Sequence, residues 1–220
     1  MIYKYFVKRL IDITLSLFAI IIFFPFLIPV IIGLLLTGEN YVFYFQERIG
    51  FKNKKFKIIK FATMLKDSPN LGSGIHTTKN DSRILPLGTF LRKTKINELP
   101  QLINILIGDM SIIGPRPLVK KTFDPYSEEV KSLIYNVKPG LSGIGSIVFR
   151  NEEDLLANSQ IPMREFYETK ISPYKGRLEL WYQKNLSFYT DFMIIIMTLI
   201  TVVRPNDKLI YKVFKSLPKK

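Results

Sequence analysis

The stretch KTKINELPQLINILIGDMSIIGPRP, residues 93–117, lies near the middle of a chain of 220 residues. It opens on lysines, places an amide and a carboxylate side by side at Asn97 and Glu98, and closes on a Gly-Pro-Arg-Pro turn. The apolar residues between positions 99 and 106 recur at the spacing of one helix face, and Gly108 is a typical stop signal. We therefore expect a helix that Asn97 caps, with Glu98 in the first turn, where the helix dipole favours an anion.

The segments on both sides of this stretch predict further short elements. YVFYFQERIG (residues 41–50) and KKFKIIKFATM (residues 54–64) are two strand candidates, the second with alternating basic and apolar residues. One short helix is expected to end near Lys95, and another to lie within residues 125–140. GLSGIGSIVF (residues 140–149) predicts a glycine-rich turn that leads into a strand. The chain is thus expected to have a mixed α/β (α+β) fold, rich in helix, without regular βαβ alternation.

The composition narrows the classes of partner. The chain carries 32 Lys+Arg against 18 Asp+Glu, a formal net charge of +14, and 47% of its residues are hydrophobic. This charge favours an anionic partner, and the hydrophobic content fits a basic domain seated on a membrane. The chain contains no cysteine, which excludes disulfides and thiolate chemistry. Its single histidine, His76, falls in a loop-like segment, where we expect a surface residue rather than a metal ligand.

An apolar run near the N-terminus is long enough to reach across a bilayer. Residues 17–36, LFAIIIFFPFLIPVIIGLLL, contain no charged residue and would extend roughly 30 Å as a helix. The basic residues on its two sides are Lys4, Lys8 and Arg9 before it, and Arg48, Lys52, Lys54, Lys55, Lys57 and Lys60 after it. Because basic flanks favour the cytoplasmic side, and because Pro25 and Pro29 disfavour a straight helix, we expect residues 1–40 to form a re-entrant membrane helix. A straight single span is the competing interpretation.

Residues 41–220 are expected to form one domain on the cytosolic face, with membrane-associated helices near its C-terminus. FMIIIMTLITVV (residues 192–203) follows Asp191 and is too short to span, so it predicts an interfacial or core helix. The tail KLIYKVFKSLPKK (residues 208–220) is basic and amphipathic, which suits an anionic lipid surface. A solvated tail explains the same pattern.

Charged residues in and around the central stretch form the best candidate site. Phosphate chemistry requires such a mixture, because cations offset phosphate charge and a carboxylate can hold a magnesium ion. Structural ion pairs would use the same residue types, so chemistry alone leaves both interpretations open. A nucleic-acid partner is not expected, because the basic residues are not interleaved with aromatic ones. The candidates are Lys60, Arg92, Lys93, Glu98, Asp109 and Arg116.

Several stretches, spread over nearly the whole chain, resemble the bacterial sugar transferases, also called small monotopic phosphoglycosyl transferases. The central block is the longest and most specific of them. The stretches are KRLIDI (8–13), YFQERIG (44–50), FKIIKFATM (56–64), TKNDSRILPLGTFLRKTKINELPQLINILIGDMSIIGPRP (78–117), VKPGLSGIG (137–145) and NLSFYTDF (185–192).

The resemblance implies a location, an activity and a cofactor. Members are held on the cytoplasmic face of the bacterial inner membrane by a re-entrant helix broken at a proline, which corresponds here to Pro25. They use Mg²⁺ to transfer a sugar-1-phosphate from a nucleoside diphosphate sugar, commonly a UDP-sugar, to polyprenol phosphate. This reaction initiates a membrane-linked glycan such as O-antigen, capsule or exopolysaccharide. Membrane lipids are therefore expected partners, and a homo-oligomer or other glycan-assembly enzymes are partners that the sequence leaves open.

The resemblance also implies roles for single residues. The glutamate that contributes to the family's metal site corresponds to Glu98. The family's strand lysine corresponds to Lys60, and the arginine of its GPRP turn to Arg116. Together with the charge pattern, this predicts substrate phosphates at Arg92, Lys93 and Arg116.

Two positions depart from the family's pattern. Asn97 stands where the family has an aspartate that attacks phosphorus, and an amide is a poor nucleophile and a weak metal ligand. Ala62 replaces the arginine of the usual KFRTM. We therefore expect transfer by a non-covalent route, in which polyprenol phosphate attacks the donor directly and Glu98, Asn97 and Lys60 form the catalytic group. The alternatives are glycosyl transfer that releases UDP, and a non-catalytic subunit that binds substrate or scaffolds a glycan assembly complex.

Overall fold

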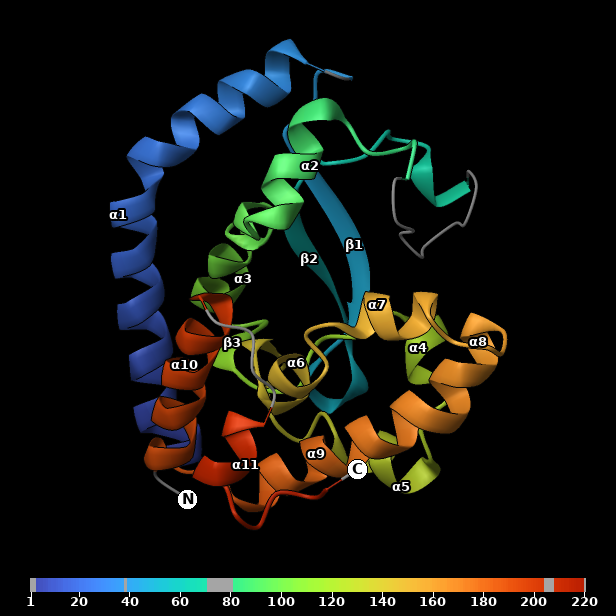
Figure 1. The fold of residues 1–220 in the computed structure, drawn as a ribbon. Helices are drawn as coiled ribbons and strands as arrows, with labels where there is room; N and C mark the ends of the chain where they lie inside the picture. Colours follow the sequence, from blue (N-terminus) through green and yellow to red (C-terminus); the bar gives the residue numbers. More distant parts are fainter. Residues whose placement is uncertain (1–2, 38, 71–80, 204–207, 220) are drawn as a thin grey trace.

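The computed structural model of the protein describes residues 3–37, 39–70, 81–203 and 208–219. The fold is about 60% helical and its strands form two small sheets, so it is mixed α/β, as the sequence predicts. Figure 1 shows the long helix α1 (Lys8–Leu36) along one side of the molecule, with the other elements gathered beside it. His76 lies outside the described residues.

Short helices make up most of the body. Among the described residues, α1 alone is long and apolar enough to cross a membrane. The other α-helices are α2 (Pro86–Lys93), α3 (Gln101–Ile107), α4 (Lys120–Phe123), α5 (Glu128–Leu133), α6 (Ile144–Val148), α7 (Glu152–Ala157), α8 (Met163–Phe166), α9 (Ser172–Lys184), α10 (Phe188–Val203) and α11 (Leu209–Val213). The 3₁₀ and π segments are η1 (Tyr3–Val7), η2 (Phe51–Asn53), η3 (Ser68–Asn70), η4 (Ile96–Glu98) and η5 (Tyr167–Ile171).

The strands in the described part of the chain form two separate pairs. The antiparallel pair is β1 (Phe43–Ile49) with β2 (Lys55–Phe61), and the parallel pair is β3 (Ser111–Ile113) with β4 (Gly140–Ser142). In the hairpin, Tyr44 lies opposite Lys60 and Arg48 lies opposite Phe56. Because side chains alternate between the two faces of a strand, residues 44, 46 and 48 of β1 share one face with Lys60. Both predicted strands of this hairpin are therefore confirmed, and their register brings basic residues together.

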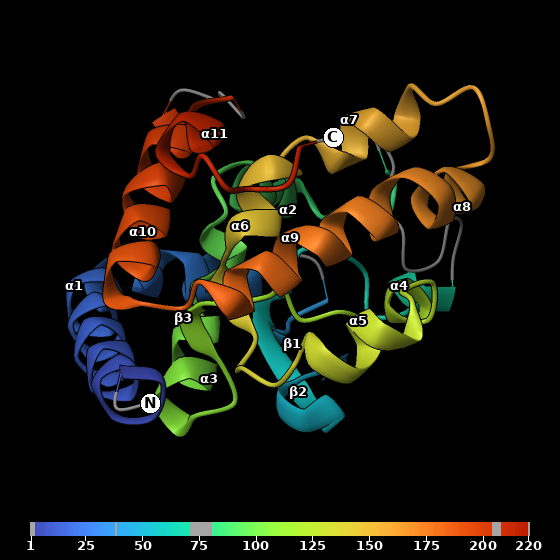
Figure 2. The same cartoon turned by 90° about the horizontal axis from the view of Figure 1, so that it is seen from below.

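Helix α1 is continuous over 29 residues and contains Pro25 and Pro29. Figure 1 shows that it is bent, which follows from the lost backbone donor and the steric clash that each proline introduces. The break predicted at Pro25 therefore takes the form of a bend within one helix. Ala19 packs against the cluster around Ile58, and Leu34 is buried beside Phe61. The body thus follows α1 along much of its length, and Figure 2 shows α3 and α10 beside it.

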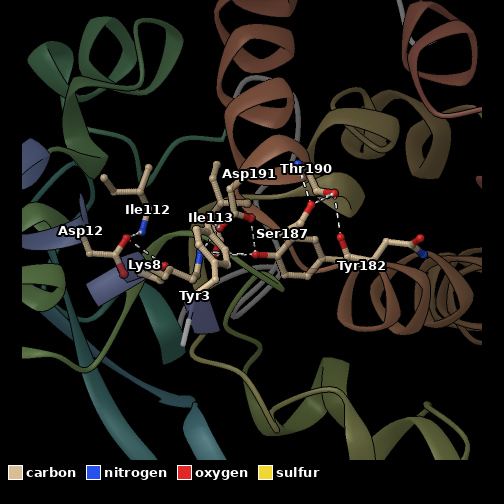
Figure 3. A network of polar contacts seen from close by, with 11 residues as sticks. Tyr3, Lys8, Asp12, Ile112, Ile113, Tyr182, Ser187, Thr190 and Asp191 are labelled. Carbon is tan, nitrogen blue, oxygen red and sulfur yellow. Dashed lines mark hydrogen bonds and ion pairs between the residues drawn. The ribbon is translucent and has the colours of Figure 1, made fainter. Parts of the chain in front are cut away.

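A buried polar network joins the N-terminal part of α1 to α10 (Figure 3). Lys8 Nζ donates to Asp191 Oδ2 at 2.6 Å and to the carbonyl oxygen of Ile113 at 2.9 Å. Asp191 also accepts from the hydroxyl of Tyr182 at 2.7 Å and from that of Tyr3 at 2.6 Å. Three donors thus share one buried carboxylate, which satisfies the hydrogen-bonding demand of a charge removed from water.

The basic residues that precede the apolar run serve the fold. Arg9 donates to the carbonyl oxygens of Ile105 and Leu106 at 2.5 and 2.7 Å, in the last turn of α3. Lys8 is 8% exposed and paired with Asp191. Lys8 and Arg9 thus bind partners within the body, and their role as a basic flank of a membrane segment stays a prediction.

The predicted helix of the central stretch begins later than expected. Asn97 and Glu98 lie in η4, and α3 begins at Gln101, after Pro100. Pro100 has no N–H to donate, and the residues before it close tighter bonds, such as that from the N–H of Leu99 to the carbonyl of residue 96. Asn97 forms no cap, so that prediction is wrong. Gly108 ends the helix with a φ of 98°, as predicted.

The glycine-rich segment after β4 continues as a helix. The predicted strand is wrong, because residues Ile144–Val148 form α6. Ile144, Ile147 and Val148 are buried in the largest hydrophobic cluster together with residues of α9 and α10. Strand propensity of β-branched residues is weak, and burial of this apolar face decides the conformation.

The C-terminal apolar helix α10 begins at Phe188, earlier than the sequence predicts. Ser187 Oγ accepts from the N–H of Thr190 at 3.2 Å and caps the helix. Asp191 therefore lies within the first turn rather than before the helix, which places its carboxylate against Lys8.

Candidate functional site

Three charged side chains from three elements meet at one carboxylate oxygen. β2 carries Lys60, η4 carries Glu98, and Arg116 lies in the turn after β3. Glu98 Oε1 accepts from Lys60 Nζ at 3.4 Å and from Arg116 Nη2 at 3.1 Å. The side chains of Lys60 and Glu98 are each 15% exposed, and that of Arg116 is 38% exposed. The structure thus brings together three predicted site residues, whose roles remain predictions.

The cluster shifts the protonation of both Glu98 and Lys60. Burial alone would raise the pKa of Glu98, but Arg116, Lys60 and Lys95 outweigh it and hold that pKa well below its usual range. Burial lowers the pKa of Lys60 to about 8, although Glu98 favours the charged form. Glu98 is therefore ionised at neutral pH, and Lys60 loses its proton at a pH only slightly above neutral.

A further cation, Arg48, lies beside this cluster and was not among the predicted site residues. It donates through Nε and Nη2 to Gln46 Oε1 at 3.1 and 2.5 Å, and through Nη1 to the carbonyl of Pro117 at 3.1 Å. Burial, and then the neighbouring Arg116 cation, lower the pKa of Arg48 to about 10. The signal that could have found it is the two-residue strand period, which puts Arg48 on the same hairpin face as Lys60.

Tyr135 holds the turn that carries Arg116. Its hydroxyl donates to the carbonyl of Arg116 at 2.8 Å and accepts from the N–H of Leu118 at 3.0 Å. The side chain is 1% exposed and stacks on Phe123 with ring centroids 5.9 Å apart. One buried hydroxyl thus fixes the backbone on both sides of Pro117. No local sequence signal marks such a contact, because it joins residues 17 and 19 positions apart.

The same turn packs against a second backbone segment without room for side chains. A Cβ atom on Gly143 would lie 2.1 Å from the carbonyl oxygen of Gly114, and one on Gly140 would lie 2.1 Å from the nitrogen of Gly114. The β3–β4 pairing brings these backbones into contact. Glycine is therefore required here for space, and the contact fixes the start of the Gly-Pro-Arg-Pro turn.

Asp109 belongs to a different part of the fold. It follows α3, at the opposite end of that helix from Glu98, and Asp109 Oδ2 accepts from Asn104 Nδ2 at 3.4 Å. Asn104 in turn binds the N–H of Ile59 and the carbonyl of Lys57, each at 2.9 Å. Asp109 and Asn104 therefore help to hold β2 against α3, and Asp109 does not join the Glu98 cluster.

Arg92 and Lys93 lie in the last turn of α2, which packs against η4. Arg92 Nη1 lies 3.8 Å from the sulfur of Met64, and Lys93 is exposed. Among the described residues, Glu98 forms its ion pairs with Lys60 and Arg116. The role of Arg92 and Lys93 in phosphate binding remains a prediction.

Asn97 and Ala62 are both buried at the edge of this site. Asn97 is 7% exposed, and its Oδ1 is buried without a hydrogen-bond partner among the described residues. Leaving such an acceptor unpaired costs about 1–3 kcal/mol. Ala62 is 0% exposed, so its methyl group offers nothing to a bound substrate.

The cluster fits a divalent metal ion only as the partner of a bound phosphate. Within the described ranges, no group of three or more His, Cys, Asp or Glu side chains could hold a metal ion. Both cations bind Glu98 through Oε1, which leaves Oε2 as a ligand atom. Magnesium is commonly bound by one or two carboxylates together with substrate phosphates, and Glu98 suits that mode.

Comparison with known proteins places the chain in a family. The family model described as bacterial sugar transferase matches residues 3–205. The chain therefore belongs to the bacterial sugar transferase family, as its motifs predict.

Three relatives illustrate the range of similar proteins. The UDP-N-acetylgalactosamine-undecaprenyl-phosphate N-acetylgalactosaminephosphotransferase of Aeromonas hydrophila is 32% identical over 90% of this chain. The UDP-glucose:undecaprenyl-phosphate glucose-1-phosphate transferase of Klebsiella pneumoniae is 34% identical over 87% of it. An uncharacterized sugar transferase of Bacillus subtilis is 32% identical over 87% of it.

The chain spans 44% and 39% of the lengths of the Aeromonas and Klebsiella proteins and 84% of the Bacillus protein. The family is membrane-associated, and its sugar phosphotransferases generally use a divalent metal ion.

Proposed function

We propose that the protein transfers a sugar-1-phosphate from a UDP-sugar to polyprenol phosphate at the cytoplasmic face of the bacterial inner membrane, and so initiates a surface glycan. Membership of the bacterial sugar transferase family supports the reaction class. The names of the Aeromonas and Klebsiella relatives give UDP-sugars and undecaprenyl phosphate as their substrates, which supports the choice of donor and acceptor.

The observation that carries the proposal is the cluster around Glu98. Lys60 and Arg116 share one oxygen of this carboxylate, and Arg48 adds a third cation nearby. Cations in a partly buried site stabilise the charge of phosphate groups more strongly than they would in water. The site therefore suits a diphosphate donor and a phosphate acceptor.

The proposed route is a direct displacement. An oxygen of polyprenol phosphate attacks the phosphorus that carries the sugar and forms a new P–O bond. The bond from that phosphorus to the bridging oxygen breaks, and UMP leaves with the bonding electrons. Lys60 and Arg116 offset the phosphate charges and align the two substrates. Asn97 cannot replace the family's aspartate as nucleophile, because its amide is neutral and its oxygen is buried.

A magnesium ion, if bound, would be held by Glu98 together with substrate phosphates and would add positive charge at the phosphates. The side chains of this chain provide the remaining positive charge. Glu98 stays ionised across the physiological range, because Arg116 and Lys60 hold its pKa low.

The contacts of α1 support a helix that enters and leaves the membrane on one side. Lys8 near its start binds Asp191, and Leu34 near its end packs against Phe61 and Leu91. Both ends thus contact the same body. A straight span would carry one end of α1 across roughly 30 Å of hydrocarbon, away from that body.

A second candidate is a non-catalytic subunit that binds the same substrates. The oxygen of Asn97 favours this alternative, since the position carries no charge and this oxygen has no hydrogen-bond partner among the described residues. Glycosyl transfer is a third candidate, in which the bond from the sugar carbon to phosphate breaks and UDP leaves.

Analysis of the released nucleotide distinguishes these candidates. Purified protein is incubated with Mg²⁺, polyprenol phosphate and a panel of UDP-sugars. We expect UMP, with the phosphosugar on the lipid. Release of UDP would establish glycosyl transfer instead. If neither nucleotide appears while substrate binding is demonstrated, the protein is a non-catalytic subunit.

The variant Asn97→Asp tests the direct route. We expect the natural chain to release UMP without a phosphosugar adduct on the protein in intact-mass spectrometry, because it lacks a nucleophilic carboxylate. Asn97→Asp should allow such an adduct to form. An adduct on the natural chain would contradict direct transfer.

A further inference from the structure

Arg48 is held firmly but is not neutralised by its own hydrogen bonds. Its guanidinium donates to the amide oxygen of Gln46 and to the backbone carbonyl of Pro117, both of which are uncharged. A guanidinium has five N–H donors. These bonds use one donor on each nitrogen, so Nη1 and Nη2 each retain one N–H that can donate to a phosphate.

The groups that surround Arg48 carry more positive than negative charge. Arg116 lies close enough to lower the pKa of Arg48, and Arg48 in turn lowers that of Lys60. The carboxylate of Glu98 opposes this effect and raises the pKa of Arg48. Its Oε1, however, already binds Lys60 and Arg116. Like charges that are partly removed from water repel one another unless an anion joins them.

We infer that Arg48 is a phosphate-binding residue of this site, and that Gln46 is the positioning residue that orients its guanidinium. The inference deepens the proposed function and rests on it, since it names a ligand for the same site. The bond to Pro117 would couple Arg48 to the turn that carries Arg116, so that both arginines bind one phosphate-bearing substrate.

The phosphate could belong to the donor diphosphate or to the lipid acceptor. The two sources share their chemistry, so the experiment measures both. UDP serves as the probe for the donor, and a short-chain prenyl phosphate serves as the probe for the acceptor.

Gln46→Glu separates the charge of Arg48 from its structural role. Glutamate has the shape of glutamine and accepts the same bonds from Nε and Nη2, so the hairpin and the Pro117 contact are preserved. Its negative charge neutralises Arg48. Lys57→Gln is the matched control, because it changes the net charge by the same amount from an exposed position on the other face of the hairpin. Binding of each probe is measured on the full chain in detergent, with thermal unfolding of every variant.

We expect Gln46→Glu to weaken binding of at least one probe by about tenfold or more, which is the effect of losing one charge-assisted phosphate contact. Thermal stability should be retained, and Lys57→Gln should bind like the natural chain. Arg48→Gln is the second variant and should weaken the same probe. The probe that responds identifies the phosphate.

Unchanged affinity for both probes in a folded Gln46→Glu protein would overturn the role of Arg48 and leave the proposed function intact. An equal loss of probe affinity in Lys57→Gln would show that the effect comes from the net charge of the protein. This result would also overturn the role of Arg48. If the natural chain binds neither probe, both the inference and the proposed function fail. If a probe binds in a manner that depends on Arg48 but the protein shows no turnover, Arg48 is still a phosphate-binding residue, and the proposed catalytic activity fails.

Discussion

At Glu98, one carboxylate oxygen binds both Lys60 and Arg116, and in the proposed function the other oxygen would bind a metal ion. Glu98→Gln preserves the shape of the side chain and removes its charge. We expect turnover, measured as UMP release, to fall roughly 100-fold or more, which is typical for loss of a charged group that acts on the reaction. Membrane association, measured by flotation with liposomes, should not change.

Glu47→Gln is the control for this variant, because Glu47 pairs with Lys55 on the exposed side of the hairpin. It should retain full turnover. Unchanged turnover in Glu98→Gln would remove Glu98 from the mechanism.

Lys60 should give the site a pH dependence near neutrality. Its pKa is lowered to about 8 by burial, so the cation is present below that pH and lost above it. Affinity for UDP should therefore fall as the pH rises from 7 to 9. Folding stability should instead rise with pH, because the pKa of Lys60 in the folded protein lies below its unfolded value of 10.5. Burial of the cation destabilises the fold fully below a pH of about 8, and this destabilisation is lost between pH 8 and 10.5.

Lys60→Arg provides the comparison, since an arginine remains charged throughout this range. The fall in UDP affinity should disappear in this variant. The same fall in Lys60→Arg would assign the titration to another group.

At the scale of the elements, the turn after β3 depends on the hydroxyl of Tyr135. Tyr135→Phe keeps the stack on Phe123 but leaves the carbonyl of Arg116 and the N–H of Leu118 without that partner. The free energy of unfolding should fall by about 1–3 kcal/mol, and UDP affinity should fall with it because Arg116 loses its fixed backbone. Chemical unfolding and UDP titration measure the two effects.

Tyr189→Phe is the matched control, because Tyr189 is 60% exposed. It should alter neither stability nor affinity. If Tyr135→Phe were destabilised but bound UDP normally, the hydroxyl would serve the fold without positioning Arg116.

The elements that sequence patterns predict well are those with a regular period or a clear stop. The hairpin follows from alternation in β1 and β2, and the end of α3 follows from Gly108. The predicted start of α3 was wrong because the helix begins only after Pro100. The predicted strand at α6 was wrong because burial of its apolar face favours a helix there. At the site, Lys60, Glu98 and Arg116 were predicted from charge type and family motifs. Tyr135 could not be, because its contact with the turn is made only by the tertiary fold.

A second element-scale prediction concerns the contact between α9 and α6. Glu179 on α9 is 2% exposed, the backbone of Gly145 hydrogen-bonds to it, and its Oε2 lacks a partner among the described residues. Burial raises its pKa to about 8 from 4.5, although Lys175 and the Gly145 bond oppose the shift. Because the folded protein holds this proton more tightly than the unfolded chain, stability should fall as the pH rises from about 4.5 to 8.

Glu179→Gln retains a neutral side chain at every pH. Its stability relative to the natural chain should increase with pH, by on the order of a few kcal/mol above pH 8. Unfolding curves at pH 5.5, 7 and 8.5 measure this difference. Glu128→Gln, whose side chain is 90% exposed in the natural chain, is the control and should show no such trend. A pH-independent difference in Glu179→Gln would mean that Glu179 is not neutral in the folded protein.

At the scale of the whole molecule, α1 and the body form one unit. The Lys8–Asp191 pair fixes the start of α1, and the packing of Leu34 on Phe61 and Leu91 fixes its end. Much of the apolar surface of α1 still faces outward, including Phe18 at 62% and Phe26 at 71% exposure. An exposed apolar face on a helix that is held at both ends favours partial insertion into one leaflet over a full crossing.

Single cysteines can test this arrangement, because the natural chain contains none. Phe6→Cys lies before α1 at a position that is 70% exposed, and Lys54→Cys lies on the exposed tip of the hairpin. In a re-entrant arrangement both should react with a membrane-impermeant maleimide in inside-out vesicles and neither in right-side-out vesicles. Phe26→Cys should be protected in both preparations, since the bend would place it in hydrocarbon. Reaction of Phe6→Cys only from the outside, with Lys54→Cys reacting only from the inside, would establish a straight span. In that case the Lys8–Asp191 pair could not form in the membrane-bound protein, because its two partners would lie on opposite sides.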